Sequence, residues 1–341
     1  MFARVFEWIF GRRQPKSGRR IGVLIVHGIG TREVGYSEAF RKRLKKHLKR
    51  KFHLRAPHTI CFEEVFWAGA TKSLQSEYQL NNIVYHPQLE QNHIRKFVIE
   101  SLADAAAFQN ISYGLNNGGE TMYERIKRSI AVSMDNLCAK VGPQAPLVVV
   151  AHSFGGWMMS CYIDDLRKQA ADKREAGFNL TQHEAFRSFD TLGGIVTFGC
   201  NIPAFVFCMD PGSVDPVDLP GRQLTRLERT PDKDGSERRC WLNFYSPWDP
   251  LGYPLRTINQ AYDDVVQDIC LQIKPRIDRG WLLDFTTPHL GYWKHETVVA
   301  ETSALIHDLY EFSDILHLEP GHAISNDEVD HTVQQPDVAA A

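Results

Sequence analysis

The sequence lacks any Cys-x-x-Cys pair, and its seven cysteines are scattered along 341 residues. They are Cys61, Cys138, Cys161, Cys200, Cys208, Cys240 and Cys270. An odd number of cysteines without close spacing argues against a disulfide framework and against a zinc site. The pattern favours reduced thiols, and we therefore expect a cytoplasmic protein.

Long apolar runs are also missing. No segment approaches the ~20 apolar residues that a membrane-spanning helix needs. The first ten residues are mostly apolar, but Arg4 and Glu7 interrupt them, and this makes them a poor signal peptide.

Residues 1–20 leave two interpretations open. An apolar set at helical spacing precedes a basic set: Phe2, Val5, Phe6, Ile9 and Phe10, then Arg12, Arg13, Lys16, Arg19 and Arg20. Such a segment is typical of a short helix that lies on an anionic membrane surface. It also fits a helix docked on the protein's own surface, followed by a polar linker. The first interpretation predicts peripheral contact with the inner membrane surface.

A large net charge is absent too. The chain has 39 Lys and Arg against 41 Asp and Glu, so no global basic field points to nucleic acid, and we expect no nucleic-acid partner. One local exception is a helix predicted over residues 35–51, where Phe40, Leu44 and Leu48 form an apolar stripe among many cations. This is typical of a solvated helix face, and an anionic membrane or an acidic partner is the alternative.

The most informative stretch runs from Val148 to Gly156. Three valines read as a buried strand of a parallel sheet, and Ala151-His152-Ser153-Phe154-Gly155 follows as a variant of the Gly-x-Ser-x-Gly turn. Such a sharp turn needs small residues two positions before and after the serine, because strand and helix backbones pass close together. The pattern predicts that Ser153 stands at the tip of the turn with its hydroxyl exposed. The alternative is an ordinary strand-to-helix loop.

A second glycine-containing loop follows the first strong strand, residues 21–26. It reads His27-Gly28-Ile29-Gly30, and glycines there let a backbone N–H point into a site. The pairing of this loop with the Ser153 turn predicts an oxyanion hole.

Strand and helix patterns alternate along the rest of the chain. Strands are predicted at residues 59–67, 194–198, 241–245 and 281–285, and helices at residues 120–141, 154–168, 257–273 and 294–316. This alternation predicts an α/β domain over residues 21–318 with a mostly parallel twisted sheet and helices on both faces. Insertions are expected at about residues 68–118, with a helix at 94–108, and at 201–239. Residues 319–341 read as a disordered tail.

Catalytic side-chain types gather where the carboxyl ends of the predicted strands meet. Ser153, Asp249 and His289 follow three different strands, and this is the chain order of the α/β-hydrolase triad. The chain resembles the serine hydrolases of the α/β-hydrolase superfamily, in its lipase and esterase branch. Its His-Gly-Ile-Gly and Ala-His-Ser-Phe-Gly-Gly motifs are similar to those of small bacterial lipases. Cys200-Asn201 departs from the serine-proline that is common after the corresponding strand, and we expect it to alter the shape of the pocket.

The resemblance implies a role for each residue. Ser153 would be the nucleophile, His289 its base, and Asp249 the acid that holds the imidazole in one tautomer. The N–H groups of Ile29 and Phe154 would bind the oxyanion, and no metal or organic cofactor is needed. His152, His295 and His27 are rival histidines, and Asp284 is the second choice for the acid.

Apolar side chains near these residues predict the substrate class. Trp157, Trp248, Phe205 and Tyr292 are expected to contact an apolar acyl group. We therefore expect a serine esterase or lipase that cleaves a small-molecule or lipid ester through an acyl-enzyme. A thioesterase or acyltransferase with the same triad, and a non-catalytic binding protein of this fold, remain alternatives. The sequence leaves the oligomeric state open.

Overall fold

A computed structural model describes most of the central part of the chain. The described residues are 20–30, 33–56, 58–86, 88, 108, 121–206, 214–220, 239–278, 282–284 and 286–312. The predicted N-terminal helix, the predicted tail 319–341 and all but one residue of the predicted helix 94–108 lie outside them.

The strands and helices alternate, as the sequence predicts. The strands are β1 (Ile21–Val26), β2 (Ile60–Val65), β3 (Leu147–His152), β4 (Leu192–Phe198), β5 (Trp241–Tyr245), β6 (Val266–Cys270), β7 (Arg276–Asp278) and β8 (Leu282–Asp284). The helices are α2 (Glu38–Phe52), α3 (Gly69–Tyr85), α5 (Met122–Val141), α6 (Phe154–Glu175), α7 (Gln182–Arg187), α8 (Ile202–Val206), α9 (Gln260–Val265), α10 (Thr286–Gly291), the 3-10 turn η4 (Tyr292–Lys294) and α11 (Glu296–Phe312).

Six parallel strands form the central sheet in the order β2-β1-β3-β4-β5-β6. Every residue of β1, β3 and β4 is buried, which explains their continuous apolar runs. From β1 the chain moves first to β2 on one side and then to β3 on the other. The sheet therefore has a topological switch point between β1 and β3.

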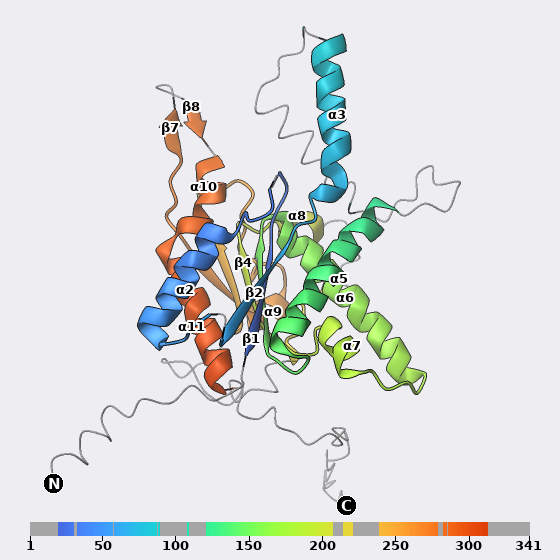
Figure 1. Ribbon diagram of the computed structural model, residues 1–341. Helices are drawn as coiled ribbons and strands as arrows, with labels where there is room; N and C mark the ends of the chain where they lie inside the picture. The colour runs from blue at the N-terminus through green and yellow to red at the C-terminus, as the bar shows by residue number, and fades with distance from the viewer. Residues whose placement is uncertain are drawn as a thin grey trace, which may run out of the picture.

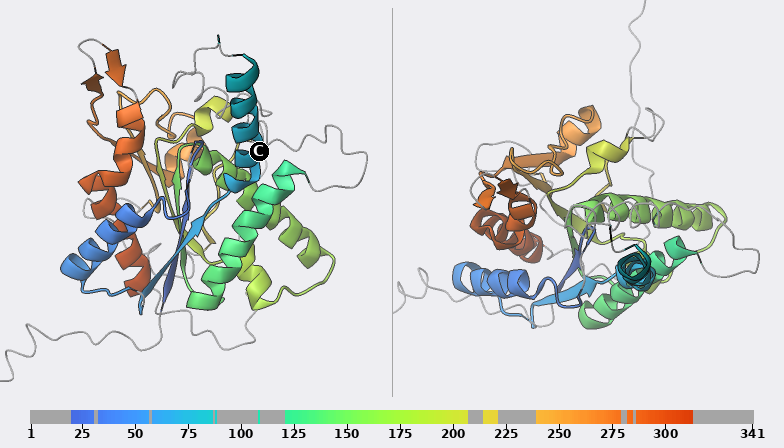
Figure 2. Two further views of the ribbon diagram at one scale, coloured as in Figure 1. Left: turned by 45° about the horizontal axis from the view of Figure 1, so that its top comes forward. Right: turned by 90° about the horizontal axis from the view of Figure 1, so that it is seen from above.

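Helices cover both faces of the sheet, so that the molecule has three layers (Figures 1 and 2). α2 and α11 pack together on one face, and α5 and α6 lie on the other. Glycines in the strands let two of these helices come close. A Cβ at Gly22 would lie 3.2 Å from Leu137 of α5, and a Cβ at Gly194 would lie 2.9 Å from Leu305 of α11. The predicted α/β architecture with a parallel sheet and helices on both faces is confirmed.

The predicted helix 120–141 is confirmed as α5, and its start has a local cause. The Thr121 side chain accepts a hydrogen bond from the Glu124 N–H, while the Glu124 carboxylate accepts one from the Thr121 N–H. This capping box satisfies two backbone donors that the helix itself leaves unpaired. The predicted helix 35–51 begins later, at Glu38, and ends where His53 takes the left-handed conformation, with φ 59°.

The predicted helix 257–273 is wrong over its second half. Only Gln260–Val265 is helical, and Val266–Cys270 is the edge strand β6. Tertiary pairing overrides the local pattern, because β6 completes the hydrogen bonds of β5. The Asp268 carboxylate anchors this strand by accepting hydrogen bonds from the Asn243 side chain and from the N–H groups of Leu255 and Arg256, at 2.6, 3.0 and 3.0 Å.

One further expectation about the C-terminal part needs correction. The strand predicted at residues 281–285 is β8, which pairs antiparallel with β7 in a hairpin outside the six-stranded sheet. The helix predicted at residues 294–316 is α11, and the shorter α10 and η4 precede it. The hairpin and α3, which occupies the start of the predicted insertion at residues 68–118, project beyond the sheet (Figure 1).

In the described part of the chain, no helix is both long and apolar enough to cross a bilayer.

Candidate active site

Ser153 occupies a strained turn between β3 and α6. Its φ and ψ are 54° and −130°, a combination that residues with a side chain rarely adopt. The turn is crowded, since a Cβ at Gly155 would lie 2.6 Å from the His27 carbonyl oxygen. A glycine is therefore required two residues after the serine, as the sequence motif predicts.

The loop after β1 lies directly against Ser153, because β1 and β3 are neighbours in the sheet. A Cβ at Gly28 would lie 2.5 Å from the Ser153 Cβ and 3.1 Å from its Oγ. The first N–H groups of α6, beginning with Phe154, have no acceptor within their own helix. Gly28 and the start of α6 thus lie beside Ser153, where the sequence predicts the oxyanion hole.

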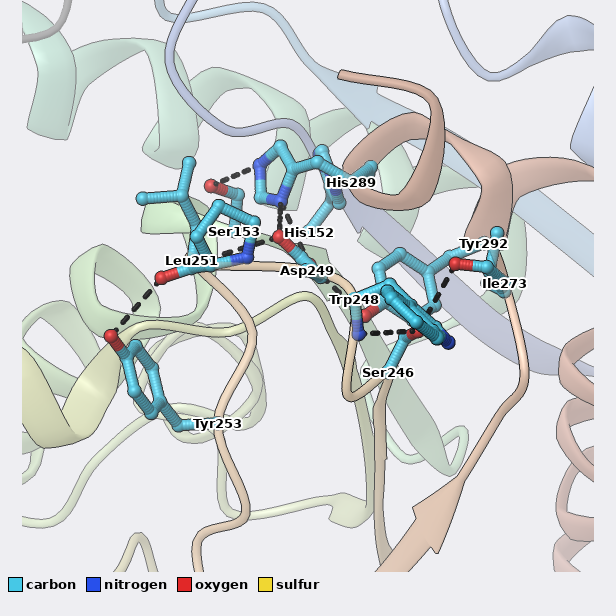
Figure 3. Close-up of polar contacts among 11 residues, drawn as sticks. His152, Ser153, Ser246, Trp248, Asp249, Leu251, Tyr253, Ile273, His289 and Tyr292 are labelled. Carbon is cyan, nitrogen blue, oxygen red and sulfur yellow. Dashed lines mark hydrogen bonds and ion pairs between the residues drawn. The ribbon is translucent and has the colours of Figure 1, made fainter. Parts of the chain in front are cut away.

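His289 bridges Ser153 and Asp249 (Figure 3). Its Nε2 lies 3.0 Å from Ser153 Oγ, and its Nδ1 lies 3.1 and 3.0 Å from the two carboxylate oxygens of Asp249. A carboxylate only accepts hydrogen bonds, so Nδ1 carries a proton, and Nε2 is the ring nitrogen that faces the hydroxyl. The three residues that the sequence selects therefore meet in hydrogen-bonding distance.

The Asp249 side chain is fully buried and held from several sides. Burial alone would raise the pKa of this carboxyl, but hydrogen bonds from His289, the Leu251 N–H and the Tyr292 hydroxyl keep the pKa below its ordinary value. The carboxylate therefore stays ionised at neutral pH. Asp284, the second choice for the acid, lies opposite Arg276 in the separate β7–β8 hairpin.

His152 does not face the serine hydroxyl. Its Nε2–H donates to the backbone carbonyl of His289 at 2.9 Å, and the two rings lie 4.7 Å apart. Burial, together with the neighbouring His289, lowers the pKa of His152 to about 3, so this ring is neutral. His152 thus braces the backbone that carries the candidate base.

His27 braces the loop after β1. Its Nδ1–H donates to the Gly28 carbonyl at 2.6 Å, and its Nε2 accepts the Trp67 N–H at 3.3 Å. The ring stacks on the Trp67 indole with centroids 5.0 Å apart, and burial lowers its pKa to about 4. The remaining rival, His295, accepts the Thr297 N–H at the start of α11. Each of the three rival histidines thus makes hydrogen bonds to backbone groups and not to Ser153.

Two of the four predicted substrate contacts lie beside the nucleophile. Trp157 of α6 and Phe205 of α8 are half-buried and stack with centroids 5.4 Å apart. The Phe205 ring also lies 5.4 Å from that of Phe154, the residue after the serine. These rings form an apolar wall next to the candidate nucleophile.

The other two predicted contacts lie elsewhere. Tyr292 is fully buried, and its hydroxyl donates to Asp249 at 3.0 Å, so it supports the acid and does not face a substrate. Trp248 is 42% exposed and lies on the Ser246 side of Asp249, away from Ser153 (Figure 3). Both residues are neighbours of the site in sequence, but the direction of their side chains could not be read from sequence spacing.

The structure adds two glycines that the sequence analysis did not select. Gly199, with φ 57°, follows β4, and a Cβ there would lie 3.1 Å from the Asp249 carboxylate and 3.2 Å from His289 Nδ1. A Cβ at Gly252 would lie 2.6 Å from the same carboxylate. These glycines leave room for the hydrogen bond between acid and base. The only signal in the sequence is that each follows a predicted strand end.

Cys200, at the position where the chain departs from the resemblance, is fully buried under α6. A Cβ at Gly156 would lie 2.5 Å from its Sγ. The thiol therefore packs against the second glycine of the serine turn, which explains why the motif ends in two glycines. Its pKa is raised to about 12 by burial, so it stays a thiol.

Among the described residues, no group of three or more His, Cys, Asp and Glu side chains is arranged to hold a metal ion. No protein-family model matches the chain, and no curated protein matches its sequence.

Proposed function

We propose that the protein is a serine hydrolase of the α/β-hydrolase type that cleaves carboxylic esters through an acyl-enzyme. The observation that carries the proposal is the position of His289, with one ring nitrogen 3.0 Å from Ser153 Oγ and the other 3.0 Å from Asp249. An unassisted serine hydroxyl is a weak nucleophile, and a base in this position with a carboxylate behind it is what activates one.

In the proposed reaction, Ser153 Oγ attacks the ester carbonyl carbon while His289 Nε2 takes the hydroxyl proton. The carbonyl oxygen becomes an oxyanion, and in this proposal the N–H groups of Phe154 and Ile29 stabilise it. The tetrahedral intermediate then collapses, the C–O bond to the alcohol breaks, and His289 gives its proton to the leaving oxygen. Water repeats the sequence on the acyl-enzyme and releases the carboxylic acid.

Electrostatics supports the same assignment. The imidazolium that forms on His289 lies against a buried carboxylate whose pKa is below its ordinary value. The Asp249 carboxylate can therefore pair with the imidazolium as soon as His289 takes the proton. His152 and His27 stay neutral, so they add no positive charge beside that imidazolium. The apolar wall of Trp157 and Phe205 favours an acyl chain over a charged substituent at that position.

Turnover of p-nitrophenyl esters tests the proposal. Ser153→Ala is expected to lower kcat by ~10⁴ to 10⁶-fold. Asp249→Asn is expected to cost far more activity than Asp284→Asn, because loss of the acid places His289 in the wrong tautomer. Near-normal activity of Ser153→Ala, or a larger loss in Asp284→Asn, would overturn the assignment. Acyl thioesters assayed alongside distinguish an esterase from a thioesterase that uses the same triad.

A further inference from the structure

A cleft of about 420 Å³ lies at the β2 edge of the sheet, and no residue of the triad lines it. Its lining residues come from β2, the edge strand, from α2 and from the last turn of α5. Figure 1 shows these three elements. Arg20, just before β1, and Ile60, the first residue of β2, line it. Its lining extends along β2 to Arg41, whose ion-pair partner Glu64 is the next-to-last residue of that strand.

Cations surround this cleft. The cationic side chains in its lining are Arg41 and Lys45 of α2, Lys140 of α5, and Arg20; His58 also lines it. Two of the cations have partners: Lys140 forms an ion pair with Glu63, and Arg20 donates to the Lys140 carbonyl.

The two α2 cations of the cleft are incompletely neutralised. Arg41 has only a long ion pair with Glu64, at 3.7 Å, and its buried Nε has no hydrogen-bond partner in the described part of the chain. Glu64 is already engaged, because its carboxylate accepts the N–H groups of Gly35 and Ser37. The Lys45 Nζ lies over the Phe62 ring at 5.5 Å and has no carboxylate partner among the described residues.

The cleft also has an apolar part, here called its floor. Ile60 and Phe62 of β2 point to the same face of the sheet, where Lys45 of α2 meets Phe62, and Ala56 lines the cleft with them. Cys61 points to the opposite face, where its Sγ meets the Lys140 carbonyl of α5. A site that puts charged donors above an apolar floor matches a ligand with an anionic head and an apolar chain. A purely ionic ligand would leave the floor unused, and a neutral apolar ligand would leave the buried Arg41 Nε without an acceptor.

The surroundings of the cleft reinforce its preference for anions. The other α2 cations are Lys42, Arg43, Lys46, Lys49, Arg50 and Lys51, and none has an ion-pair partner among the described residues. Their summed field raises the local concentration of anions.

We propose that this cleft is a second ligand site, separate from the triad, that binds one amphiphilic anion. Arg41 and Lys45 hold the anionic head, and Ile60 and Phe62 contact the first part of the chain. A phosphate head suits these donors well, because an Arg guanidinium presents paired N–H groups to phosphate oxygens. The ligand is either free in solution or part of an anionic bilayer.

Octyl phosphate is the soluble probe, with butyl phosphate and inorganic phosphate for comparison. Titration calorimetry on the full chain at physiological ionic strength should show affinity that increases with chain length, by up to about fourfold per methylene that reaches the floor. Equal binding of inorganic phosphate and octyl phosphate, or no binding of any of the three, would overturn the proposal.

Lys45→Glu and Lys46→Glu form a matched pair of variants. Both reverse one exposed charge on the same helix, but only Lys45 lines the cleft. We expect Lys45→Glu to weaken octyl phosphate binding by at least about tenfold and Lys46→Glu to change it by less than about threefold. Equal losses in the two variants would mean that the overall charge of α2 attracts the anion, and would contradict the cleft as the binding site.

Vesicles distinguish the two sources of the anion. Flotation with phosphatidylcholine alone and with added phosphatidic acid is compared for the same two variants. Recovery that requires phosphatidic acid and falls only in Lys45→Glu identifies a bilayer lipid as the source. Octyl phosphate binding without vesicle recovery identifies a free amphiphile. Neither result depends on the triad, so Ser153→Ala is expected to bind as the unaltered chain does.

Discussion

At the scale of single residues, the site depends on hydrogen bonds that reach it from buried neighbours. Asp249 is held by Tyr292 and by the Leu251 N–H, and His289 is held through its backbone carbonyl by His152. Two of these supporting side chains, Tyr292 and His152, do not touch the space above Ser153. Tyr292 therefore acts on the position and pKa of Asp249, and His152 acts on the position of His289.

Tyr292→Phe removes one donor from the Asp249 carboxylate and keeps the ring in the core. We expect kcat on p-nitrophenyl esters to fall about tenfold, the size of one lost hydrogen bond to a charged group, with little change in KM. Tyr253→Phe is the matched control, because its hydroxyl donates to the exposed Pro250 carbonyl. Equal, small effects in both variants would show that Tyr292 serves only packing.

The two buried histidines predict how stability depends on pH. The pKa values of His152 and His27 are lowered from 6.5 to about 3 and about 4 in the folded protein. Between pH 6.5 and 4 the unfolded chain therefore binds protons that the folded chain does not. Their contribution to stability is present above pH 6.5 and declines as the pH falls toward 4, by about 1.4 kcal/mol per pH unit for each histidine.

His152→Gln should reduce this slope. Its amide keeps a donor for the His289 carbonyl but does not titrate, so the slope of unfolding free energy between pH 6 and 4 should lose about one proton equivalent. Urea denaturation at several pH values measures the slope. His86→Gln, at an exposed position, is the control and should leave it unaltered. An unchanged slope in His152→Gln would contradict the buried, neutral state of this ring.

At the scale of elements, the sequence predicts best where a segment is buried on both faces. The sequences of β1, β3 and β4 are short, continuous apolar runs. In a chain that alternates strands and helices, such a run fits a strand that is buried on both faces. The turn at Ser153 is predictable for the same local reason, since its small residues and its strand are contiguous.

The edge strand β6 was not predictable from local pattern. Ile258, Tyr262, Val266, Ile269 and Ile273 recur at helical spacing, so the pattern fits a helix as well as a strand. The decision comes from partners distant in sequence: the free edge of β5, and the Asn243 amide that meets Asp268. The placement of His289 in α10 and the inward direction of Tyr292 likewise depend on contacts across the fold.

The apolar wall formed by α6 and α8 predicts a preference among acyl chains. We expect kcat/KM on p-nitrophenyl esters to increase from acetate to about hexanoate or octanoate, because each fitting methylene contributes about fourfold. Phe205→Ala should flatten this increase and leave acetate turnover nearly unchanged, since it removes the ring between Phe154 and Trp157.

Phe178→Ala is the matched control, because that ring is 66% exposed at the far end of α6. An enzyme that prefers acetate, or a Phe205→Ala variant with an unaltered chain-length profile, would show that the wall does not contact the acyl group.

At the scale of the whole molecule, the strand order explains why distant residues meet. The switch point between β1 and β3 brings residues 27–30 against Ser153, and the parallel direction of β3 and β5 brings Ser153 and Asp249 to one end of the sheet. Positive charge is concentrated on α2, which lies beside the β2 edge of the sheet. In this account the carboxyl ends of the central strands carry the proposed chemistry, and the β2 edge of the sheet carries a separate anion site.

Covalent labelling with a fluorophosphonate, followed by mass spectrometry of the modified peptide, tests the central claim most directly. A fluorophosphonate reacts with a serine only when a neighbouring base activates it. We expect one label per chain, on Ser153, with labelling lost in Ser153→Ala and slowed by at least about 10²-fold in a folded Asp249→Asn variant. Absence of labelling in the folded protein, or a label on another residue that persists in Ser153→Ala, would contradict the triad.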